Sequence, residues 1–264
     1  MKMTIGLGQI YPKLGNVPAN LEKHLDYIED ATAQNVDLII FPEMSLTGYQ
    51  VMDMVPELAI RASADDPVFG QMLDASHKTD IMFGFVQEDA RNRFYIAAAY
   101  LSGGKTVHIH HKVYLPTYTM FDDGRYFDEG QHIRAFDTRF GRMGMLICED
   151  FWHMSAPYVL WMDGADILLL QSCSPSRGIS TQRDDVRRPC SAIEMPRDGL
   201  QLCSKSISAP NGSVLDVECA CQTKSSGLLY CHRFDMGGSA IFLHNALSTS
   251  DRRLLQKAQA QDES

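Results

Sequence analysis

Three short strand-like runs end at residues that can do chemistry, and this feature most limits how the chain can fold. An apolar run leads to Glu43, an alternating run leads to Lys112, and a second apolar run ends at Cys148. Such runs predict buried or half-buried β-strands. Ligands bind at the carboxyl ends of strands in sheets covered by helices. Glu43 is therefore expected at a ligand-binding edge, and Cys148 where a rigid strand opens into a pocket.

Each of these residues also has an ordinary structural interpretation when it is taken alone. A free cysteine usually packs as a small buried hydrophobic side chain. A glutamate after a strand commonly caps a helix or lies in solvent, and a lysine that closes a strand is commonly an exposed edge charge. It is the combination that favours a catalytic role.

Glu43, Lys112 and Cys148 together could supply the base, the cation and the nucleophile of one reaction. A thiol of pKa about 8.5 needs a base or a cationic neighbour to become a thiolate near neutral pH. Glu43 can take the proton, while Lys112 can stabilise the thiolate and the oxyanion formed when the thiolate attacks a carbonyl. The backbone N–H of Glu149, beside the nucleophile, is a natural second oxyanion donor. The pattern therefore predicts nucleophilic catalysis by a thiol.

The three segments resemble the Glu-Lys-Cys motifs of the nitrilase superfamily of carbon-nitrogen hydrolases. They read FPEMSLTGY, HHKVYLPTY and GMLICEDFW, and their order and spacing also match. The opening stretch GLGQIYPKLGNVPANLEKHLDYIEDA resembles the first strand and helix of the family, so the likeness covers residues 3–180. Within the superfamily, the motifs look most like the glutaminase part of glutamine-dependent NAD synthetase and its stand-alone amidase relatives.

One position departs from the pattern of this branch. Its members usually carry a second glutamate in the loop after the lysine, and this glutamate positions the lysine and the substrate. The matching residue here is Asp123, which is one methylene shorter. It can still accept a hydrogen bond from Lys112, but small misplacements of a catalytic group are costly. The resemblance implies four catalytic residues, which are Glu43, Lys112, Cys148 and Asp123.

The resemblance also suggests which residues line the substrate pocket. By their places in or near the motifs and strand ends, these are Tyr49, Phe121, Glu149, Trp152, Ser172 and Ser174. Core packing is the alternative role for the aromatic residues, and a simple turn is the alternative for the two serines.

Strand-like runs alternate with helical segments through the first two-thirds of the chain. Strands are predicted at 36–41, 81–86, 94–101, 106–110, 132–136, 143–147 and 166–170, and helices at 16–35, from Asp66 onward, and at 156–163. Gly103-Gly104 marks a hairpin. Hairpins combined with crossovers indicate mixed sheets in an α/β fold. The resemblance implies a four-layer α-β-β-α sandwich of two mixed sheets that commonly pairs with another subunit.

Composition is consistent with a single domain over residues 1–264. The chain has 264 residues, is 45% hydrophobic and carries a net charge of −9, which argues against a nucleic-acid partner. It holds no apolar stretch of membrane-spanning length, and the start leads directly into a strand-like run, so no membrane partner and a cytoplasmic location are expected. The seven cysteines are then expected to be reduced.

The segment 185–264 diverges from the family pattern. Members of this branch continue with an Asn-Arg-x-Gly motif, a Gly-Gly-Ser strand and an Asp-Pro-x-Gly turn. Here Gly237-Gly238-Ser239 resembles the second of these, but the turn does not follow it. Genuine divergence and a shifted reading frame in the gene both account for this.

The most specific functional prediction is a thiol amidase that acts on a small-molecule amide, as a homo-oligomer and without a cofactor. A glutaminase that supplies ammonia to a separate synthetase, a nitrilase, and a non-catalytic binding or scaffold subunit remain alternatives. The pair His108 and His110 could ligate zinc, but no further ligand is identifiable, so no metal is expected. The segment 141–144 is predicted to form a hairpin turn rather than a phosphate-binding loop.

Overall fold

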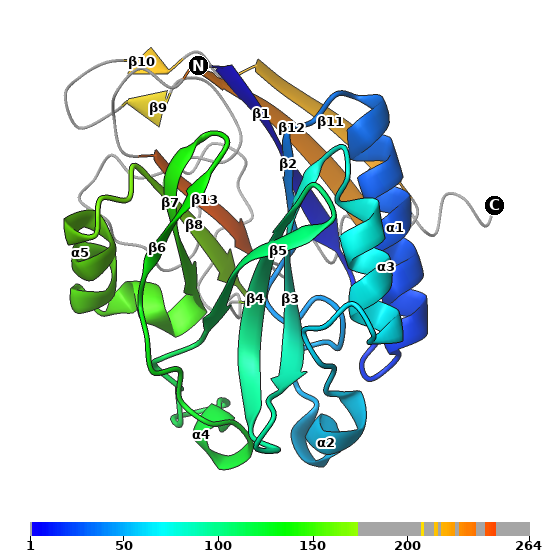
Figure 1. The fold of residues 1–264 in the computed structure, drawn as a ribbon, viewed down its shortest axis with the longest axis vertical. Coiled ribbons are helices and arrows are strands. Elements are labelled where there is room, and N and C mark those ends of the chain that lie inside the picture. Colours follow the sequence, from blue (N-terminus) through cyan, green and yellow to red (C-terminus); the bar gives the residue numbers. More distant parts are fainter. Residues whose placement is uncertain are drawn as a thin grey trace.

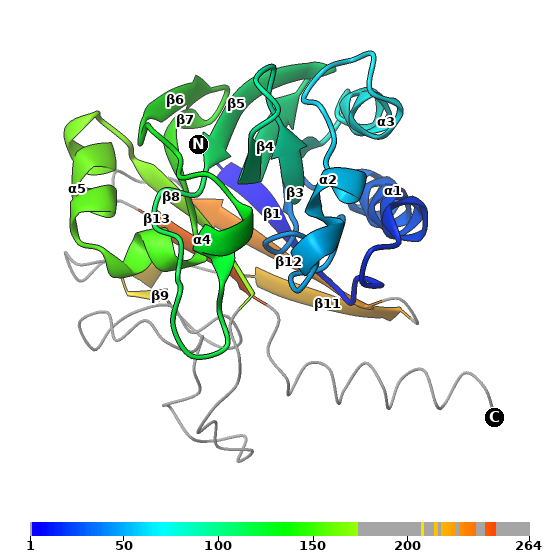
Figure 2. The ribbon, with the colours of Figure 1, turned by 90° about the horizontal axis from the view of Figure 1, so that it is seen from below.

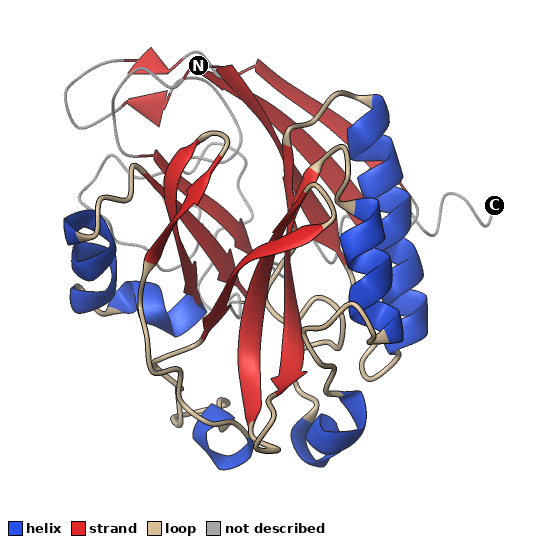
Figure 3. Cartoon of the chain, viewed as in Figure 1, coloured by secondary structure: helices blue, strands red, loops and turns tan. Residues whose placement is uncertain are grey.

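The protein is a sandwich of two mixed β-sheets with helices on both outer faces (Figures 1 and 2). A computed structural model describes residues 2–173 and the strand segments 207–208, 214–215, 218–224, 227–235 and 241–246. The two sheets face each other, with α1 and α3 on one outer side and α5 on the other (Figure 3). This arrangement confirms the predicted α-β-β-α architecture.

The larger sheet has seven strands in the order β11-β12-β1-β2-β3-β4-β5. Strands β1, β2 and β3 run parallel, and the other neighbours pair antiparallel. The strands span β1 (Lys2–Ile10), β2 (Leu38–Ile40), β3 (Asp80–Glu88), β4 (Phe94–Ser102), β5 (Lys105–His111), β11 (Glu218–Lys224) and β12 (Gly227–Asp235). The Gly103-Gly104 hairpin joins β4 to β5 as predicted.

The smaller sheet has four strands in the order β13-β8-β7-β6. Strands β13, β8 and β7 are parallel, and β6 is antiparallel to β7. The strands span β6 (Ala135–Thr138), β7 (Gly141–Ile147), β8 (Ile167–Ser172) and β13 (Ile241–Ala246), and a separate short pair is formed by β9 (Ile207–Ser208) and β10 (Val214–Leu215). Strands from the segment 185–264 therefore extend both sheets.

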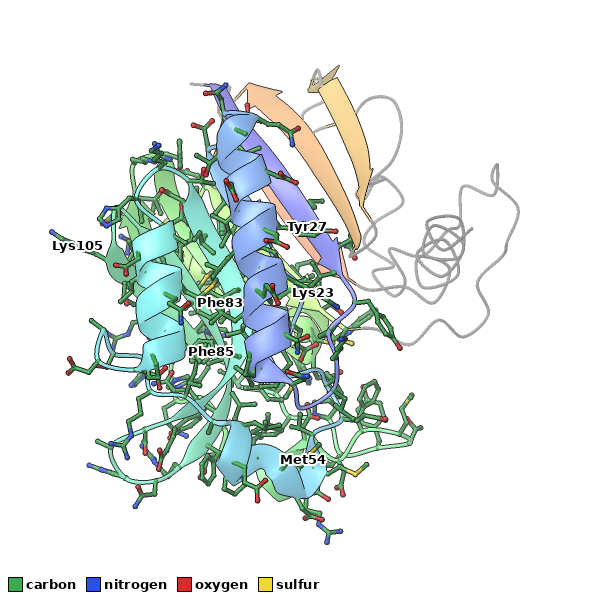
Figure 4. The ribbon with its side chains drawn as sticks, turned by 90° about the vertical axis from the view of Figure 1, so that its right-hand side faces the viewer. Lys23, Tyr27, Met54, Phe83, Phe85 and Lys105 are labelled. Atoms are coloured by element: carbon green, nitrogen blue, oxygen red, sulfur yellow. The ribbon has the colours of Figure 1, made fainter. Side chains whose placement is uncertain are left out.

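Helices α1 (Val17–Ala33) and α3 (Pro67–Ala75) lie side by side over the larger sheet (Figure 4). Both begin where the sequence predicts, because Asn16 and Asp66 accept hydrogen bonds from the free N–H groups of the first turns. Phe83 and Phe85 of β3 lie beneath the helices. The remaining helical segments are η1 (Met52–Met54), α2 (Val55–Leu58), α4 (Asp123–Tyr126), η2 (Cys148–Trp152) and α5 (Ser155–Met162).

Alternation along β7 fixes which side chains enter the central core. Met143, Met145 and Ile147 face the larger sheet, whereas Leu146 packs outward with Leu160 of α5. Because the side-chain period of a strand is two, a slip by one residue would move the whole set to the wrong face. The register therefore determines where the residue after Ile147 lies.

Two predicted boundaries near β6 were wrong. The strand predicted at 132–136 begins only at Ala135, where pairing with β7 starts, and continues to Thr138. The hairpin turn lies before Gly141 rather than over 141–144, and Gly141 opens β7 with a φ of 113° that few other residues adopt. None of the helices in the described part of the chain combines the length and the hydropathy of a membrane-spanning helix.

Candidate active site

A buried ionic cluster forms where strands of both sheets end. Glu43 follows β2, Lys112 directly follows β5, and Cys148 directly follows β7. Lys112 Nζ lies 2.8 Å from Glu43 Oε1 and 2.9 Å from Asp123 Oδ2. Lys112, Glu43 and Asp123 are here called the Lys112 cluster. The tertiary structure thus brings together four residues spread over more than a hundred positions of the sequence.

Lys112 is 0% exposed, which makes its environment unusual for a lysine. Burial alone would lower the pKa of Lys112, but the carboxylates of Glu43 and Asp123 outweigh this effect and raise it above the ordinary value. The amine therefore remains protonated. Removal of either partner would leave a buried charge less compensated.

Asp123 is the first residue of α4, and this position lets its short carboxylate reach Lys112. The Tyr49 hydroxyl lies 2.8 Å from both Asp123 oxygens and donates its proton to the carboxylate. The Tyr49 ring also lies 5.6 Å from Lys112 Nζ and packs edge-on against Phe121. Tyr49 thereby holds Asp123 in the orientation that contacts the lysine.

Glu43 is held at both carboxylate oxygens. Oε1 accepts from Lys112, and Oε2 accepts the backbone N–H of Cys173 at 2.9 Å. Burial raises the pKa of Glu43, and the nearby Asp123 acts in the same direction against the opposing effect of Lys112. A carboxylate whose pKa is raised above its ordinary value is better matched to proton transfer than an exposed one.

Cys148 occupies a strained position at the junction of β7 and η2. Its φ is 45°, in the left-handed region that non-glycine residues seldom adopt, and its side chain is buried. Ser172 Oγ donates to its Sγ at 3.5 Å. Burial raises the pKa of Cys148 to about 12, Glu43 adds to the rise, and Lys112 opposes it. The resting thiol is therefore protonated and needs a base to become nucleophilic.

The predicted pocket residues are distributed unevenly around this cluster. Tyr49 contacts Asp123 of the cluster, Ser172 contacts Cys148 beside it, and Phe121 packs on Tyr49. The Glu149 carboxylate accepts from the exposed Tyr118 hydroxyl at 2.8 Å, whereas Trp152 is 46% exposed at the end of η2. Ser174 lies outside the described residues.

Two buried residues beside the cluster were not singled out as site residues from the sequence. Asp150 and His110 form a pair, with His110 Nε2 2.8 Å from Asp150 Oδ2. An acidic residue at the third position of a helical turn after a strand is a recognisable capping signal, but it does not reveal this partner. His108 stacks on Phe136, and no group of three or more metal-type ligands occurs in the described part of the chain.

Comparison with known proteins gives a family match over most of the chain. The model of the carbon-nitrogen hydrolase family matches residues 4–187. A glutamine-dependent NAD(+) synthetase of Acinetobacter baylyi is 32% identical over 173 residues, covering 65% of this chain and 31% of that protein. A probable nitrilase of Schizosaccharomyces pombe is 29% identical over 178 residues, covering 64% and 63%. The chain thus spans about a third of the matched NAD synthetase.

Solved structures give the same picture. The glutamine-dependent NAD+ synthetase of Acinetobacter baumannii superimposes with a TM-score of 0.60 at 29% identity, covering 67% of this chain and 33% of that chain. Nit3 of Saccharomyces cerevisiae gives a TM-score of 0.60 at 20% identity, covering 66% of each chain. An amidase from Nesterenkonia sp. gives 0.59 at 18% identity, covering 67% and 66%. The last two likenesses establish the shared fold.

Proposed function

The chain belongs to the carbon-nitrogen hydrolase family, and we propose that it acts as a thiol amidase that converts a small amide to the acid and ammonia. The observation that supports this most is the Lys112 cluster beside Cys148: a thiol, a base candidate and a protonated amine meet at one buried place. The proposal includes a cytoplasmic location, where a thiol stays reduced.

The first half of the reaction forms a thioester. Glu43 takes the proton of the Cys148 thiol, and the thiolate attacks the amide carbon. An ammonium group carries three N–H donors. Because two of those on Lys112 point at carboxylates, and the third has no hydrogen-bond partner among the described residues, the third can stabilise the oxyanion together with the Glu149 backbone N–H. The first turn of η2 leaves such N–H groups without partners inside the helix.

The second half releases the products. The tetrahedral intermediate collapses as Glu43 returns its proton to the nitrogen, which leaves as ammonia. A water molecule then gives a proton to Glu43 and attacks the thioester, and the acid departs as Cys148 recovers its proton. The groups of the chain itself and water are sufficient for every step. Asp123 fixes the lysine throughout, with the support of Tyr49.

A glutaminase that supplies ammonia to a separate synthetase is the second candidate, and two observations favour it. The identity to NAD synthetases reaches 32%, although the chain spans about a third of the matched enzyme. In addition, the Glu149 carboxylate lies one residue from the nucleophile and is only partly exposed. A carboxylate there can pair with the amino group of an amino-acid amide. A nitrilase would use the same residues on a nitrile.

The test is ammonia release from glutamine, from other small amides and from nitriles, combined with trapping of the intermediate. Rapid acid quenching and mass spectrometry should detect an acyl group on the tryptic peptide 143–177. This peptide also contains Cys173, so Cys148→Ala is the control that assigns the adduct. Turnover without a trapped adduct in any amide reaction would contradict the thioester route, and no turnover on any substrate would favour a binding or scaffold role.

A second copy of this chain is the proposed macromolecular partner. Helix α5 and the residue before it expose large apolar side chains, namely Met154, Tyr158, Val159, Trp161 and Met162. Contiguous exposed apolar surface of this kind commonly marks an interface. Light scattering should report an oligomer that Trp161→Glu weakens, and a monomer in both proteins would contradict the proposal.

A further inference from the structure

Asp150 is a fully buried carboxylate that accepts four hydrogen bonds. Its Oδ1 accepts the backbone N–H groups of Val113 and Tyr114, both at 2.9 Å. Its Oδ2 accepts the Ile147 N–H at 3.1 Å and lies 2.8 Å from His110 Nε2. Because an ionised carboxylate can only accept, the His110 nitrogen carries the proton in this pair. The charge is thus compensated by four donors without any contact to solvent.

The donors lie directly beside the proposed catalytic residues. Val113 and Tyr114 follow Lys112 in the chain, and Ile147 immediately precedes Cys148. These segments belong to different sheets, since β5 is in the larger one and β7 in the smaller one. The Asp150 carboxylate therefore links the backbone next to Lys112 with the backbone next to Cys148, from one sheet of the sandwich to the other.

Helix capping explains only part of this arrangement. The Ile147 bond is the ordinary contact between the third residue of a helical turn and the residue before that turn. The bonds from Val113 and Tyr114 come from the segment that follows β5 of the facing sheet and contribute nothing to the cap. His110 projects from β5 to the same carboxylate, which adds a third tie from that side. The network is built across the interface of the sheets, at the level of the site.

We propose that Asp150, held by His110, is a positioning residue that sets the spacing between Lys112 Nζ and Cys148 Sγ. The inference rests on the proposed amidase function, in which these atoms act on one carbonyl group. A displacement of a reacting group by about 1 Å can cost about a hundredfold in rate. Asp150 does not touch the substrate, so its loss should act on the rate and not on substrate binding.

The test compares Asp150→Asn with Asp80→Asn. Asp80 is also buried and accepts hydrogen bonds from Tyr100 and Ser102, but it begins β3, at the end of the sheet remote from Lys112. Both variants should unfold at lower temperature than the wild type. Asp150→Asn alone should lower kcat by about a hundredfold with KM changed less than about threefold. Equal kcat losses in the two variants, or an unchanged kcat in Asp150→Asn, would overturn the proposal.

A second readout does not need a substrate. The alkylation rate of Cys148 by iodoacetamide, measured by mass spectrometry at one fixed pH, reports the thiolate fraction that Lys112 favours and Glu43 opposes. Asp150→Asn should slow this alkylation, and Asp80→Asn should leave it unchanged. If the wild type hydrolyses no amide, the amidase function fails while this measurement still decides the positioning role. An unchanged alkylation rate in a folded Asp150→Asn protein would overturn that role.

His110→Gln covers the case in which Asp150→Asn does not fold. Glutamine keeps a side-chain donor toward Asp150 but lacks the ring that fixes its direction. We expect a folded protein with kcat about tenfold lower and KM little changed, because part of the ordering of Asp150 is lost. A kcat equal to that of the wild type in this variant would contradict the contribution of His110 and, with it, the proposal.

Discussion

Two buried ionic clusters lie at opposite ends of the sheets and hold their charges differently. At one end Asp80 accepts from the hydroxyls of Tyr100 and Ser102 and pairs with Arg139, whose side chain is half exposed. At the other end Lys112 is fully buried between two carboxylates. The first cluster has one positive charge for one negative charge, whereas the second has an excess negative charge.

The difference in charge balance indicates a structural role for the Asp80 cluster and a role in proton transfer for the Lys112 cluster. A balanced pair with satisfied hydrogen bonds stabilises a junction between chain segments, and Arg139 also donates to the carbonyl of Asp37. In the Lys112 cluster, burial raises the pKa of Glu43, and Asp123, which competes with Glu43 for the same cation, raises it further. The unbalanced cluster is therefore suited to exchange a proton at Glu43.

The largest expected effect concerns the thiol beside the unbalanced cluster. Cys148→Ala should reduce ammonia release more than about a thousandfold, because the nucleophile acts as part of a unit. The fold should persist, since the replacement removes only one side-chain atom at the start of η2. Ammonia release and thermal unfolding measure the two outcomes. Substantial activity in Cys148→Ala would remove the basis for a thiol mechanism.

The next largest effect distinguishes the roles of the two clusters through replacement of their cations, Lys112 and Arg139. Lys112→Met should lower kcat by at least about a hundredfold through loss of the oxyanion donor. It should also destabilise the protein by about 3–5 kcal/mol, because two carboxylates then lie buried without a cation. Arg139→Met should cost less stability, since Asp80 keeps two hydroxyl donors, and should leave kcat unchanged. Denaturant unfolding and steady-state kinetics on both variants provide the check, and similar activity losses would mean that the clusters share one role.

Glu43→Gln tests the raised pKa. We expect kcat to fall by about a hundredfold or more from loss of the base. A carboxyl group whose pKa is higher in the folded protein binds its proton more tightly when folded, so its stabilising effect is present below the unfolded pKa and is lost as pH rises through the folded pKa. Relative to Glu43→Gln, the wild type should therefore lose stability between acidic pH and the folded pKa. If the wild type instead gained stability relative to Glu43→Gln as the pH rose, the direction of the pKa shift would be contradicted.

The smallest expected effect comes from a matched pair of hydroxyl deletions. Tyr49→Phe and Tyr100→Phe each remove a hydroxyl that donates to a buried aspartate at 2.8 Å. Each should cost about 1 kcal/mol of stability. Only Tyr49→Phe should also lower kcat, by several-fold, because Asp123 then holds Lys112 less firmly. Equal kcat values in the two variants would show that the orientation of Asp123 does not limit the rate.

Local patterns in the sequence predicted most of the fold. The helices that begin after Asn16 and Asp66 and the hairpin at Gly103-Gly104 depend on contacts between residues a few positions apart. Such signals are complete within a short window of sequence. The boundaries of β6 were missed because that strand begins where β7 pairs with it, and pairing is not a local property.

For the candidate site, too, some features were predicted from the sequence and others are seen only in the tertiary structure. Glu43, Lys112 and Cys148 were found in the sequence because each follows a strand, and the ends of strands are readable from hydrophobic patterns. The tie between the two sheets at Asp150 could not be predicted from the sequence, because three of its four donors, His110, Val113 and Tyr114, lie more than thirty residues earlier in the chain. The sequence indicates which residues are the proposed reacting groups. Their spacing and their charge balance arise only when the two sheets pack together and water is excluded, because burial and neighbouring charges then decide each pKa.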